Sequence, residues 1–522
     1  MPRSCPPSST ATANRRSVAT SLRSTIGCAT HSSGSERGAR VRWARRVRRV
    51  PGTRWGEDSG MARCDMKKVA IVGLGYSGAV VIERLKQLAP AMEIDVYDAA
   101  GSIGAGLAYQ ADSPGNLVNR PASLMYLRER GDFRKWLQGT VEAGADSYQP
   151  RPLFGKFVEE SLRSSMREHL AIRYQRANVL DVTVEDGRYV LRTSIGTVPG
   201  YDALVLATGN TEPTDLYGLR GQSGYVNNPY PTVCLEGICS DRIGVLGNQL
   251  SAIDVALTLL AGNEVNHVTM LTRHSKLPNY SDEYVPCQLK VLSEDTIKRR
   301  LRIGGATLKV VETLFNEEFD AQGIDVNLSD LMRDHSRVSA SRKEIYSVLA
   351  ATNLVVPMLW HALPERERQV FVRKLRGPWR QLRVPIPKDN WMKIQHYLKA
   401  GRLACRTGLR EVRAGQQDFV VQGRGFSHAF SHIINATGSG DAMDSAIYAN
   451  MSASGLCVRH PYGGIEVRYD DCRVIGADGP SNIFAIGNPT VGVFYAVSNI
   501  DVLQMQAKTI CRNLANNQAA SR

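Results

Sequence analysis

The stretch KKVAIVGLGYSGAVVIERLKQLAPAMEIDVYD, residues 67–98, decides the fold. Its apolar run, residues 69–72, is continuous, as in a parallel strand that is buried on both faces. A turn with the spacing G-x-G-x-x-G follows, formed by Gly73, Gly75 and Gly78. In this spacing the first glycine permits a tight turn, the second lets a pyrophosphate approach the backbone, and the third lets a helix pack against the strand. The sequence therefore predicts a dinucleotide site.

The rest of this stretch completes a strand-helix-strand unit. Val81, Leu85 and Leu88 recur at i, i+4 and i+7, which predicts a helix with one apolar face. A second strand, residues 94–97, ends in Asp98. A carboxylate in this place binds the ribose hydroxyls of an adenosine. An acid that ends a strand is also a common turn residue, so Asp98 alone indicates less than the glycine turn.

Residues 1–65 have a different composition from the rest of the chain. They contain thirteen Arg, no Lys and four acidic residues, and so carry +9 of the net charge of +15. The preferred interpretation is translated upstream sequence, because Met66 stands directly before the first strand. The alternatives are an Arg-rich and Ser-rich transit peptide and a nucleic-acid patch at residues 45–49. Because the charge is concentrated here, it does not indicate nucleic-acid binding by residues 66–522.

The remaining 457 residues suit two or three domains. They contain no apolar stretch near the roughly 18 residues that a membrane span needs, so we expect no membrane segment. The cysteines show neither zinc-type spacing nor a disulfide pattern, and we expect no metal site. This usage fits a reducing compartment and predicts a cytoplasmic protein.

Two further loops belong with the first dinucleotide unit. Residues 101–106 contain three glycines, which let backbone lie against a flat ligand, and Asn116, Asn119 and Arg120 follow. An apolar strand, residues 201–210, closes on the triplet Ala-Thr-Gly. Many flavoproteins with two dinucleotide domains leave their first domain in this way, so we expect its last two residues, Thr208 and Gly209, at the cofactor site.

A second strand-turn-helix unit spans residues 242–260. Gly247 takes the first glycine position, Ala252 takes the third, and Gln249 takes the middle one. A side chain there crowds a pyrophosphate, so the second site either binds its nucleotide differently or has degraded. Arg273 ends the following strand where an acid often stands, and its guanidinium suits a 2′-phosphate. A solvated surface arginine is the alternative.

At about residues 283–400 the sequence is rich in charged residues and has the pattern of helices. Basic residues recur over residues 366–383, where they either face an anionic substrate or form a solvated helix face. Trp360, Trp379 and Trp391 either shield a reactive site from water or pack in a core.

The C-terminal segment has the pattern of a return to the first domain. A strand at residues 483–486 leads to Gly487 and Asn488. Ser498 and Asp501 match a capping pattern for a last helix, whose N-terminus would stabilise negative charge on a flavin ring.

The order of these motifs resembles the FAD/NAD(P)-binding protein family that includes FAD-dependent urate hydroxylases and aspartate N-monooxygenases. The resemblance covers residues 66–522, and it rests on the segments GLGYSG, GAGLAYQADSPGNLVNRPA, PRPLFGKF, LVLATG, LWHALPERERQVF, W-x-x-x-R and INATG. It implies an α/β fold of two Rossmann-like dinucleotide-binding domains with a helical insertion. The expected parts are residues 66–211 and 439–522 for the FAD-binding domain and residues 212–438 for the NAD(P)-binding-like domain, with the insertion at about 283–400.

The resemblance also implies a reaction in which reduced nicotinamide reduces FAD and oxygen then inserts one atom into a small polar metabolite. Gly73, Gly75, Gly78 and Asp98 would bind the adenosine diphosphate of FAD, and the loop from Asn116 to Arg120, which contains Asn119, would lie near the isoalloxazine. Asn488 stands where many relatives have an aspartate for the ribityl chain. The expected cofactors are FAD and NADPH, and the partners are a substrate and molecular oxygen. No catalytic base can be named.

Two alternatives remain open at this point. One is a flavoprotein that binds FAD and only transfers electrons, which Gln249 favours. The other is a reductase. Cys234 and Cys239 have the spacing of a redox pair in some flavin disulfide reductases, but they precede the second nucleotide unit, so a structural role is preferred.

Overall fold

The computed structural model describes residues 68–140, 147–169, 171–274, 277–281, 284–334 and 342–519. All of them lie in the compact unit Ala62–Arg522. Residues 1–65 and Met66, on which the interpretation of the leader rests, lie outside the described residues.

The first domain is built on a sheet with the strand order β18-β19-β7-β1-β2-β3. These strands are β1 (Lys68–Val72), β2 (Glu93–Tyr97), β3 (Ile172–Gln175), β7 (Ala203–Leu206), β18 (Arg473–Gly476) and β19 (Gly479–Ala485). All pairings in this sheet are parallel except that of β18 with β19. Residues 69–72 of β1 are buried, which fits a strand covered on both faces.

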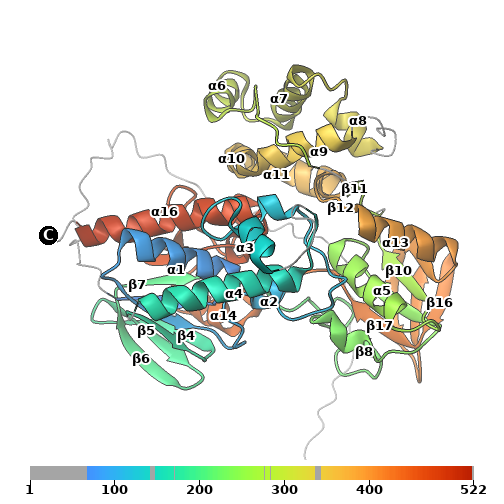
Figure 1. Ribbon diagram of the computed structural model, residues 1–522, viewed down its shortest axis with the longest axis horizontal. Coiled ribbons are helices and arrows are strands. Elements are labelled where there is room, and N and C mark those ends of the chain that lie inside the picture. Colours follow the sequence, from blue (N-terminus) through green and yellow to red (C-terminus); the bar gives the residue numbers. More distant parts are fainter. Residues whose placement is uncertain are drawn as a thin grey trace, which may run out of the picture. The chain divides into compact units, whose positions relative to one another are not determined.

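Helices cover this sheet and complete its core. The longest are α1 (Tyr76–Leu88), α4 (Arg151–Glu168) and α16 (Ile500–Ala519), and α1 and α16 lie side by side (Figure 1). Shorter segments are α2 (Gly106–Tyr109), η1 (Ala122–Leu124), α3 (Asp132–Thr140), η6 (Ala442–Asp444), α14 (Ala446–Ala453), η7 (Asn488–Thr490) and α15 (Val491–Phe494). An antiparallel sheet of β4 (Val179–Glu185), β5 (Arg188–Thr193) and β6 (Gly196–Tyr201) contacts α14.

The second domain has a parallel sheet with the order β13-β10-β9-β17-β8. Its elements are β8 (Tyr225–Val226), η2 (Thr232–Leu235), β9 (Ile243–Leu246), α5 (Leu250–Gly262), β10 (Val268–Thr272), β13 (Leu403–Thr407) and β17 (His432–Asn435). A small antiparallel sheet consists of β14 (Leu409–Ala414), β15 (Phe419–Gly423) and β16 (Phe426–Phe430). Two sheets of mainly parallel strands, flanked by helices, confirm the predicted α/β class.

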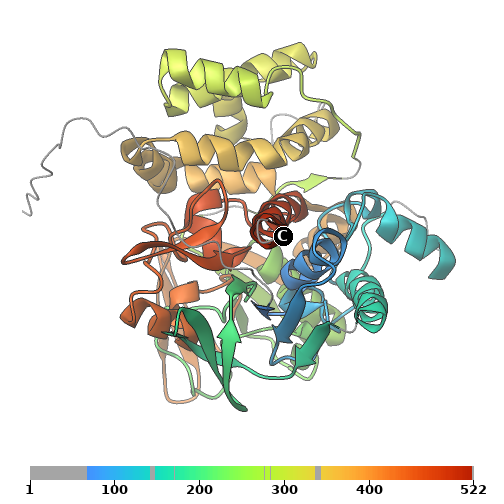
Figure 2. The ribbon, with the colours of Figure 1, turned by 90° about the vertical axis from the view of Figure 1, so that its left-hand side faces the viewer.

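A group of helices with a core of its own lies between β10 and β13 in the sequence (Figure 2). It consists of α6 (Glu294–Gly304), α7 (Leu308–Ala321), α8 (Leu328–Arg333), α9 (Arg342–Ala351), η4 (Thr352–Leu354), α10 (Val355–Ala362), α11 (Glu365–Val370), the π-helical turn η5 (Phe371–Leu375) and α12 (Arg376–Arg383). The next helix, α13 (Lys388–Lys399), packs with α5 instead. We refer to α6 through α12 as the helical insertion.

Strands β11 (Tyr280–Ser281) and β12 (Ile386–Pro387) pair at the two ends of the helical insertion. Within the described residues, one helical run, Arg342–Ala362, has the length and mean hydropathy (1.3) of a possible membrane span, and 67% of its most apolar window is buried in the protein.

Candidate functional site

The predicted FAD-binding residues lie at one edge of the first sheet. Strands β2, β1, β7 and β19 are parallel neighbours, so their carboxyl ends meet there, as in other open α/β sheets that bind ligands. These ends carry the glycine turn after β1, Asp98 after β2, Thr208 and Gly209 after β7, and Gly487 and Asn488 after β19.

Two glycines of the turn allow close backbone packing, and the third leaves room for a ligand. Gly73 has φ +100°, and a Cβ there would lie 2.3 Å from the Ala207 carbonyl oxygen. A Cβ on Gly78 would lie 2.2 Å from the Gly73 oxygen. The fold itself therefore requires both glycines. At Gly75, by contrast, the nearest atom to such a Cβ is the Gly106 Cα at 3.4 Å, so the protein leaves room on this side for a ligand, and the turn fits a pyrophosphate.

Asp98 holds the glycine turn in place. Its carboxylate accepts hydrogen bonds from the backbone N–H groups of Leu74 at 2.7 Å and Ala100 at 2.8 Å. Each carboxylate oxygen can accept a second hydrogen bond. Asp98 therefore keeps capacity for the hydroxyls of a ribose, which its predicted role requires.

The ends of β7 and β19 are fixed by side chains from elsewhere in the chain. The hydroxyl groups of Thr208 and Tyr448 are 2.8 Å apart. The Gly487 N–H donates to Gln506 of α16 at 3.0 Å, and a Cβ on Gly487 would lie 3.2 Å from the Ser77 Oγ at the start of α1. The Asn488 side chain donates to the Ser439 Oγ at 3.2 Å.

Arg120 belongs to a buried polar cluster at the start of α16. Its guanidinium is 3.0 Å from the carboxylate of Asp501, which also accepts hydrogen bonds from Tyr126 at 3.0 Å and Asn353 at 2.9 Å. Burial raises the pKa of the Asp501 carboxyl, but the charges of Arg120 and Arg130 and these hydrogen bonds outweigh it and hold that pKa below its usual range. Asp501 therefore stays ionised.

Asp501 is not part of the cap that the sequence pattern predicted. The Asp501 N–H donates to the Asn499 side chain at 2.9 Å, so Asn499 caps α16 and Ser498 is exposed. The reason is that the guanidinium groups of Arg120 and Arg130 offer the Asp501 carboxylate stronger partners than a backbone N–H.

Residues that no sequence motif identified join the helical insertion to this cluster. Arg383 donates to the Asn353 Oδ1 at 2.5 Å, and Asn353 in turn donates to Asp501. Burial lowers the pKa of Arg383 to about 10. The Tyr346 hydroxyl contacts the Asn119 carbonyl oxygen at 3.4 Å. In the sequence, only the W-x-x-x-R segment, which ends at Arg383, pointed to this arginine. Its spacing does not show that Arg383 contacts Asn353.

The turn predicted to form the second nucleotide site has a backbone similar to that of the first. Gly247 has φ +117°, and its Cβ would lie 2.7 Å from the Ala436 oxygen. Gln249 caps α5 with φ −94° and ψ −168°, close to the values of Gly75 (−76° and −168°). The Gln249 amide donates to the Asn248 Oδ1 at 2.9 Å. Arg273 is exposed, and its carbonyl oxygen accepts from the Gly408 N–H at 3.1 Å.

The cysteine pair and the search for metal ligands give no support to a redox or metal site. Cys234 and Cys239 are exposed and unpaired with each other, and burial raises the pKa of the Cys234 thiol. Within the described residues, no group of three or more His, Cys, Asp or Glu side chains could hold a metal.

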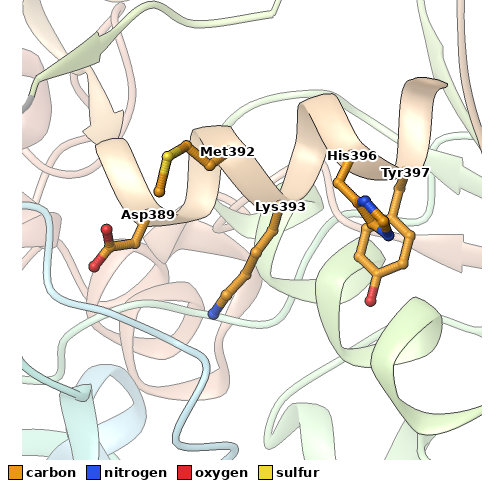
Figure 3. Close-up of a pocket in the computed structure, with 5 residues that line it drawn as sticks. All are labelled: Asp389, Met392, Lys393, His396 and Tyr397. Carbon is orange, nitrogen blue, oxygen red and sulfur yellow. The ribbon is translucent and has the colours of Figure 1, made fainter. Parts of the chain in front are cut away.

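A surface hollow of about 440 Å³ lies on α13. Its lining residues include Asp389, Lys393 and Tyr397, which extend from one side of the helix (Figure 3). None of the predicted cofactor residues lines it, so it does not belong to the site described above.

Comparison with known proteins supports the nucleotide-binding assignment. Residues 70–211 match the family model described as FAD-NAD(P)-binding, which confirms the predicted FAD/NAD(P)-binding character of the first domain. The chain is 21% identical over 281 residues to the uncharacterized protein YdhS of Escherichia coli K12, a match that covers 46% of this chain and 52% of that protein. The chain thus matches about half the length of this curated relative.

Solved structures similar to this chain share its fold over nearly their whole length. L-lysine 6-monooxygenase from Pseudomonas syringae is similar with a TM-score of 0.56, 14% identity and coverage of 87% of this chain and 99% of that one. The Kutzneria sp. 744 ornithine N-hydroxylase KtzI, in a complex with reduced FAD, NADP⁺ and L-ornithine, gives a TM-score of 0.54, 13% identity and coverage of 87% and 100%. At these identities the likeness shows the fold alone, with its two α/β domains.

Proposed function

We propose that this protein is an FAD-dependent, NADPH-using monooxygenase that acts on a small, polar, nitrogen-containing metabolite. One observation carries the proposal: the helical insertion closes onto the segment that follows the FAD loop after β19. The Trp360 Nε1 donates to the Gly492 carbonyl oxygen at 2.8 Å, and Trp360 is only 4% exposed. A reaction between reduced flavin, oxygen and a substrate needs such a cover, because water diverts reactive intermediates.

The residues of the chain bind and orient the cofactor in this account. The glycine turn takes the pyrophosphate at Gly75, Asp98 takes the adenosine ribose, and Asn488 lies beside the ribityl chain. FAD held by these residues would supply the redox chemistry. Arg120 and the N-terminus of α16 would lie towards the ring of the flavin, with the Arg120 charge already paired with Asp501.

The second nucleotide site takes NADPH. Gln249 has the same backbone conformation as Gly75, and its side chain is turned toward Asn248. Its side chain therefore need not lie in the path of a pyrophosphate. Arg273 binds the 2′-phosphate from the end of β10.

The names of similar enzymes support the proposal that the substrate contains nitrogen. The similar solved enzymes are named for lysine and ornithine, and the family that the sequence resembles includes urate hydroxylases and aspartate N-monooxygenases. Each of these substrates is small, polar and contains nitrogen.

Gln249 also favours a second candidate, an FAD-binding protein that only transfers electrons. If the glutamine side chain blocks nicotinamide binding, FAD would receive its electrons from another protein. Reduction of the bound FAD by NADPH in the absence of oxygen separates the two candidates.

The experiment that tests the proposal is a metabolite screen of the purified, FAD-loaded protein that follows NADPH and oxygen together. We expect one substrate class to raise both rates, with one oxygen consumed per NADPH and little hydrogen peroxide. Substrate-driven NADPH oxidation that continues without oxygen would assign a reductase instead.

A further inference from the structure

A buried ion pair joins the two dinucleotide-binding domains. Arg151, the first residue of α4 in the first domain, places its Nη1 2.7 Å from the Oδ2 of Asp254 on α5 in the second domain. The Asp254 side chain is only 3% exposed and that of Arg151 is 18% exposed. The Tyr230 hydroxyl donates to the same carboxylate oxygen at 3.1 Å. Separation of the two domains here would leave a buried charge without a partner, which is costly.

Arg151 also holds the loop that is expected to lie near the flavin. Its Nε donates to the Leu117 carbonyl oxygen at 3.1 Å, and its backbone N–H donates to the Asn116 carbonyl oxygen at 2.8 Å. One guanidinium therefore links Asp254 of the second domain directly to the loop formed by residues 116–120.

A second set of hydrogen bonds joins the same parts of the two domains. Thr232 of the second domain accepts from the Asn116 amide at 2.8 Å and from the Thr258 hydroxyl at 3.0 Å. Its own hydroxyl donates to the Asp112 Oδ1 at 2.9 Å, which also accepts from the Val233 N–H at 3.2 Å. Thr232 and Asn116 are buried. The Thr232 hydroxyl thus uses its donor and both acceptor positions, so a shift of either domain would leave buried polar groups unsatisfied.

Asp254 lies on the helix whose N-terminus is the proposed NADPH site. Gln249 caps α5, and Asp254 follows the first residue of the helix, Leu250, by four positions, or about 6 Å along the helix axis. A helix is rigid over such a length, so a contact that fixes Asp254 also fixes the turn before α5. The ion pair with Arg151 therefore connects this turn to residues 116–120.

We propose that Arg151 and Asp254 are positioning residues that hold the NADPH site in one fixed relation to the loop of residues 116–120. The proposal rests on the proposed function and deepens it, because reduction of FAD by NADPH depends on that relation. Reacting atoms must be aligned and about 3–3.5 Å apart, and a misplacement of about 1 Å can slow a reaction on the order of a hundredfold. Both residues act through the position of the two segments and not by contact with the reacting atoms.

Hydrogen–deuterium exchange of the FAD-loaded full-length protein tests this positioning without any turnover. Asp254→Asn keeps the shape of the side chain and removes its charge. We expect amide exchange to become about tenfold faster or more in peptides that cover residues 116–118 and 232–235, since these segments open more often when the ion pair is lost. The control is Glu411→Gln, which breaks an ion pair with Arg413 within β14, and these peptides should exchange in it as in the unmutated protein.

Anaerobic stopped-flow reduction of the bound FAD by NADPH measures the consequence. Asp254→Asn should lower the limiting rate constant about tenfold or more, while the dissociation constant of NADPH and the midpoint potential of the flavin stay unchanged. A loss of folded protein would instead lower the amount of FAD that is reduced.

A double variant separates positioning from stability. Asp254→Asn alone leaves the Arg151 charge without a partner and can impair folding. Asp254→Asn with Arg151→Gln removes both charges. The double variant should melt closer to the unmutated protein than Asp254→Asn does, and its FAD should still be reduced about tenfold more slowly or more.

Three results would overturn the inference: exchange in Asp254→Asn equals that in Glu411→Gln, the double variant is reduced as fast as the unmutated protein, or only the dissociation constant of NADPH changes. The last result would assign the pair to nucleotide binding. If NADPH binds to the unmutated protein without reducing its FAD, the proposed function is removed, and hydrogen exchange alone then decides whether the pair holds the two segments together.

Discussion

At the residue scale, the fold requires Gly73 and Gly78, whereas Gly75 is expected to be required for cofactor binding alone. Gly73 and Gly78 are required because an added Cβ would strike backbone at 2.3 Å and 2.2 Å, but Gly75 has no such contact. Gly75→Leu should therefore fold normally and purify without FAD, whereas Gly78→Ala should lower the melting temperature. Flavin absorbance per protein and a thermal scan measure both effects. Stoichiometric FAD in Gly75→Leu would show that this turn does not bind the pyrophosphate.

Asp501 gives a prediction about stability and pH. Its pKa is lower in the folded protein than the unfolded value of about 3.9, so its contribution to folding is present above about pH 4 and is lost as pH falls through the folded pKa. Asp501→Asn leaves Arg120 without its carboxylate, and we expect a loss of about 3 kcal/mol at pH 7.

Urea unfolding at several pH values measures this loss. The difference between Asp501→Asn and the unmutated protein should be constant from pH 5 to pH 7 and shrink below about pH 4. Asp330→Asn, at an exposed carboxylate that pairs with Arg333, serves as the control and should change stability little. A difference that grows as the pH falls would contradict the assignment of an ionised Asp501.

At the element scale, we expect the residue that follows β10 to decide the nicotinamide preference. Arg273 stands there without a neighbouring acid, and an acid would repel a 2′-phosphate. The unmutated protein should prefer NADPH to NADH. Arg273→Glu should lose or reverse that preference, since a lost contact between arginine and phosphate costs about 1.5–3 kcal/mol, or roughly tenfold to a hundredfold. Steady-state rates with the two nucleotides test this, and equal rates in the unmutated protein would refute it.

Helices and strands could be predicted where a local pattern in the sequence determines them. The run at residues 69–72, the spacing of Val81 and Leu85 and the A-T-G strand end correspond to β1, α1 and β7. The antiparallel sheets β4–β6 and β14–β16 were not predicted as sheets, although Asp186 and Gly187, which both have positive φ between β4 and β5, are a hairpin signal. The position of α13 was also not predictable, since its charged sequence resembles the insertion and only packing on α5 distinguishes it. Trp391 stacks there on Tyr280 at 5.6 Å, away from the core that contains Trp379.

The candidate site followed from the sequence only where motifs are local. The glycine turn and Asp98 lie within one β-α-β unit, whereas the link from Arg383 through Asn353 to Asp501 joins three distant segments. Polar contacts over such separations depend on how the domains pack. No period or spacing in the sequence encodes them.

At the scale of the whole molecule, the contact between the helical insertion and the FAD domain should control coupling. Trp360→Phe keeps an aromatic ring but loses the hydrogen bond to Gly492, so water should enter and divert oxygen to peroxide. We expect NADPH oxidation to persist while the share of hydrogen peroxide rises several-fold. Trp391→Phe, in the second core, should leave that share unchanged. Peroxide measured beside product tests the pair, and equal coupling in both variants would contradict the proposed cover.

The most direct measurement of the central claim is the fate of isotopically labelled oxygen. With a substrate from the screen, NADPH and ¹⁸O₂, one labelled atom should enter each product molecule, and the other should leave as water. Product formed in labelled water under unlabelled oxygen should carry no label. A product that takes its oxygen from water, or that forms without oxygen, would contradict a monooxygenase and assign these two nucleotide-binding domains to another reaction.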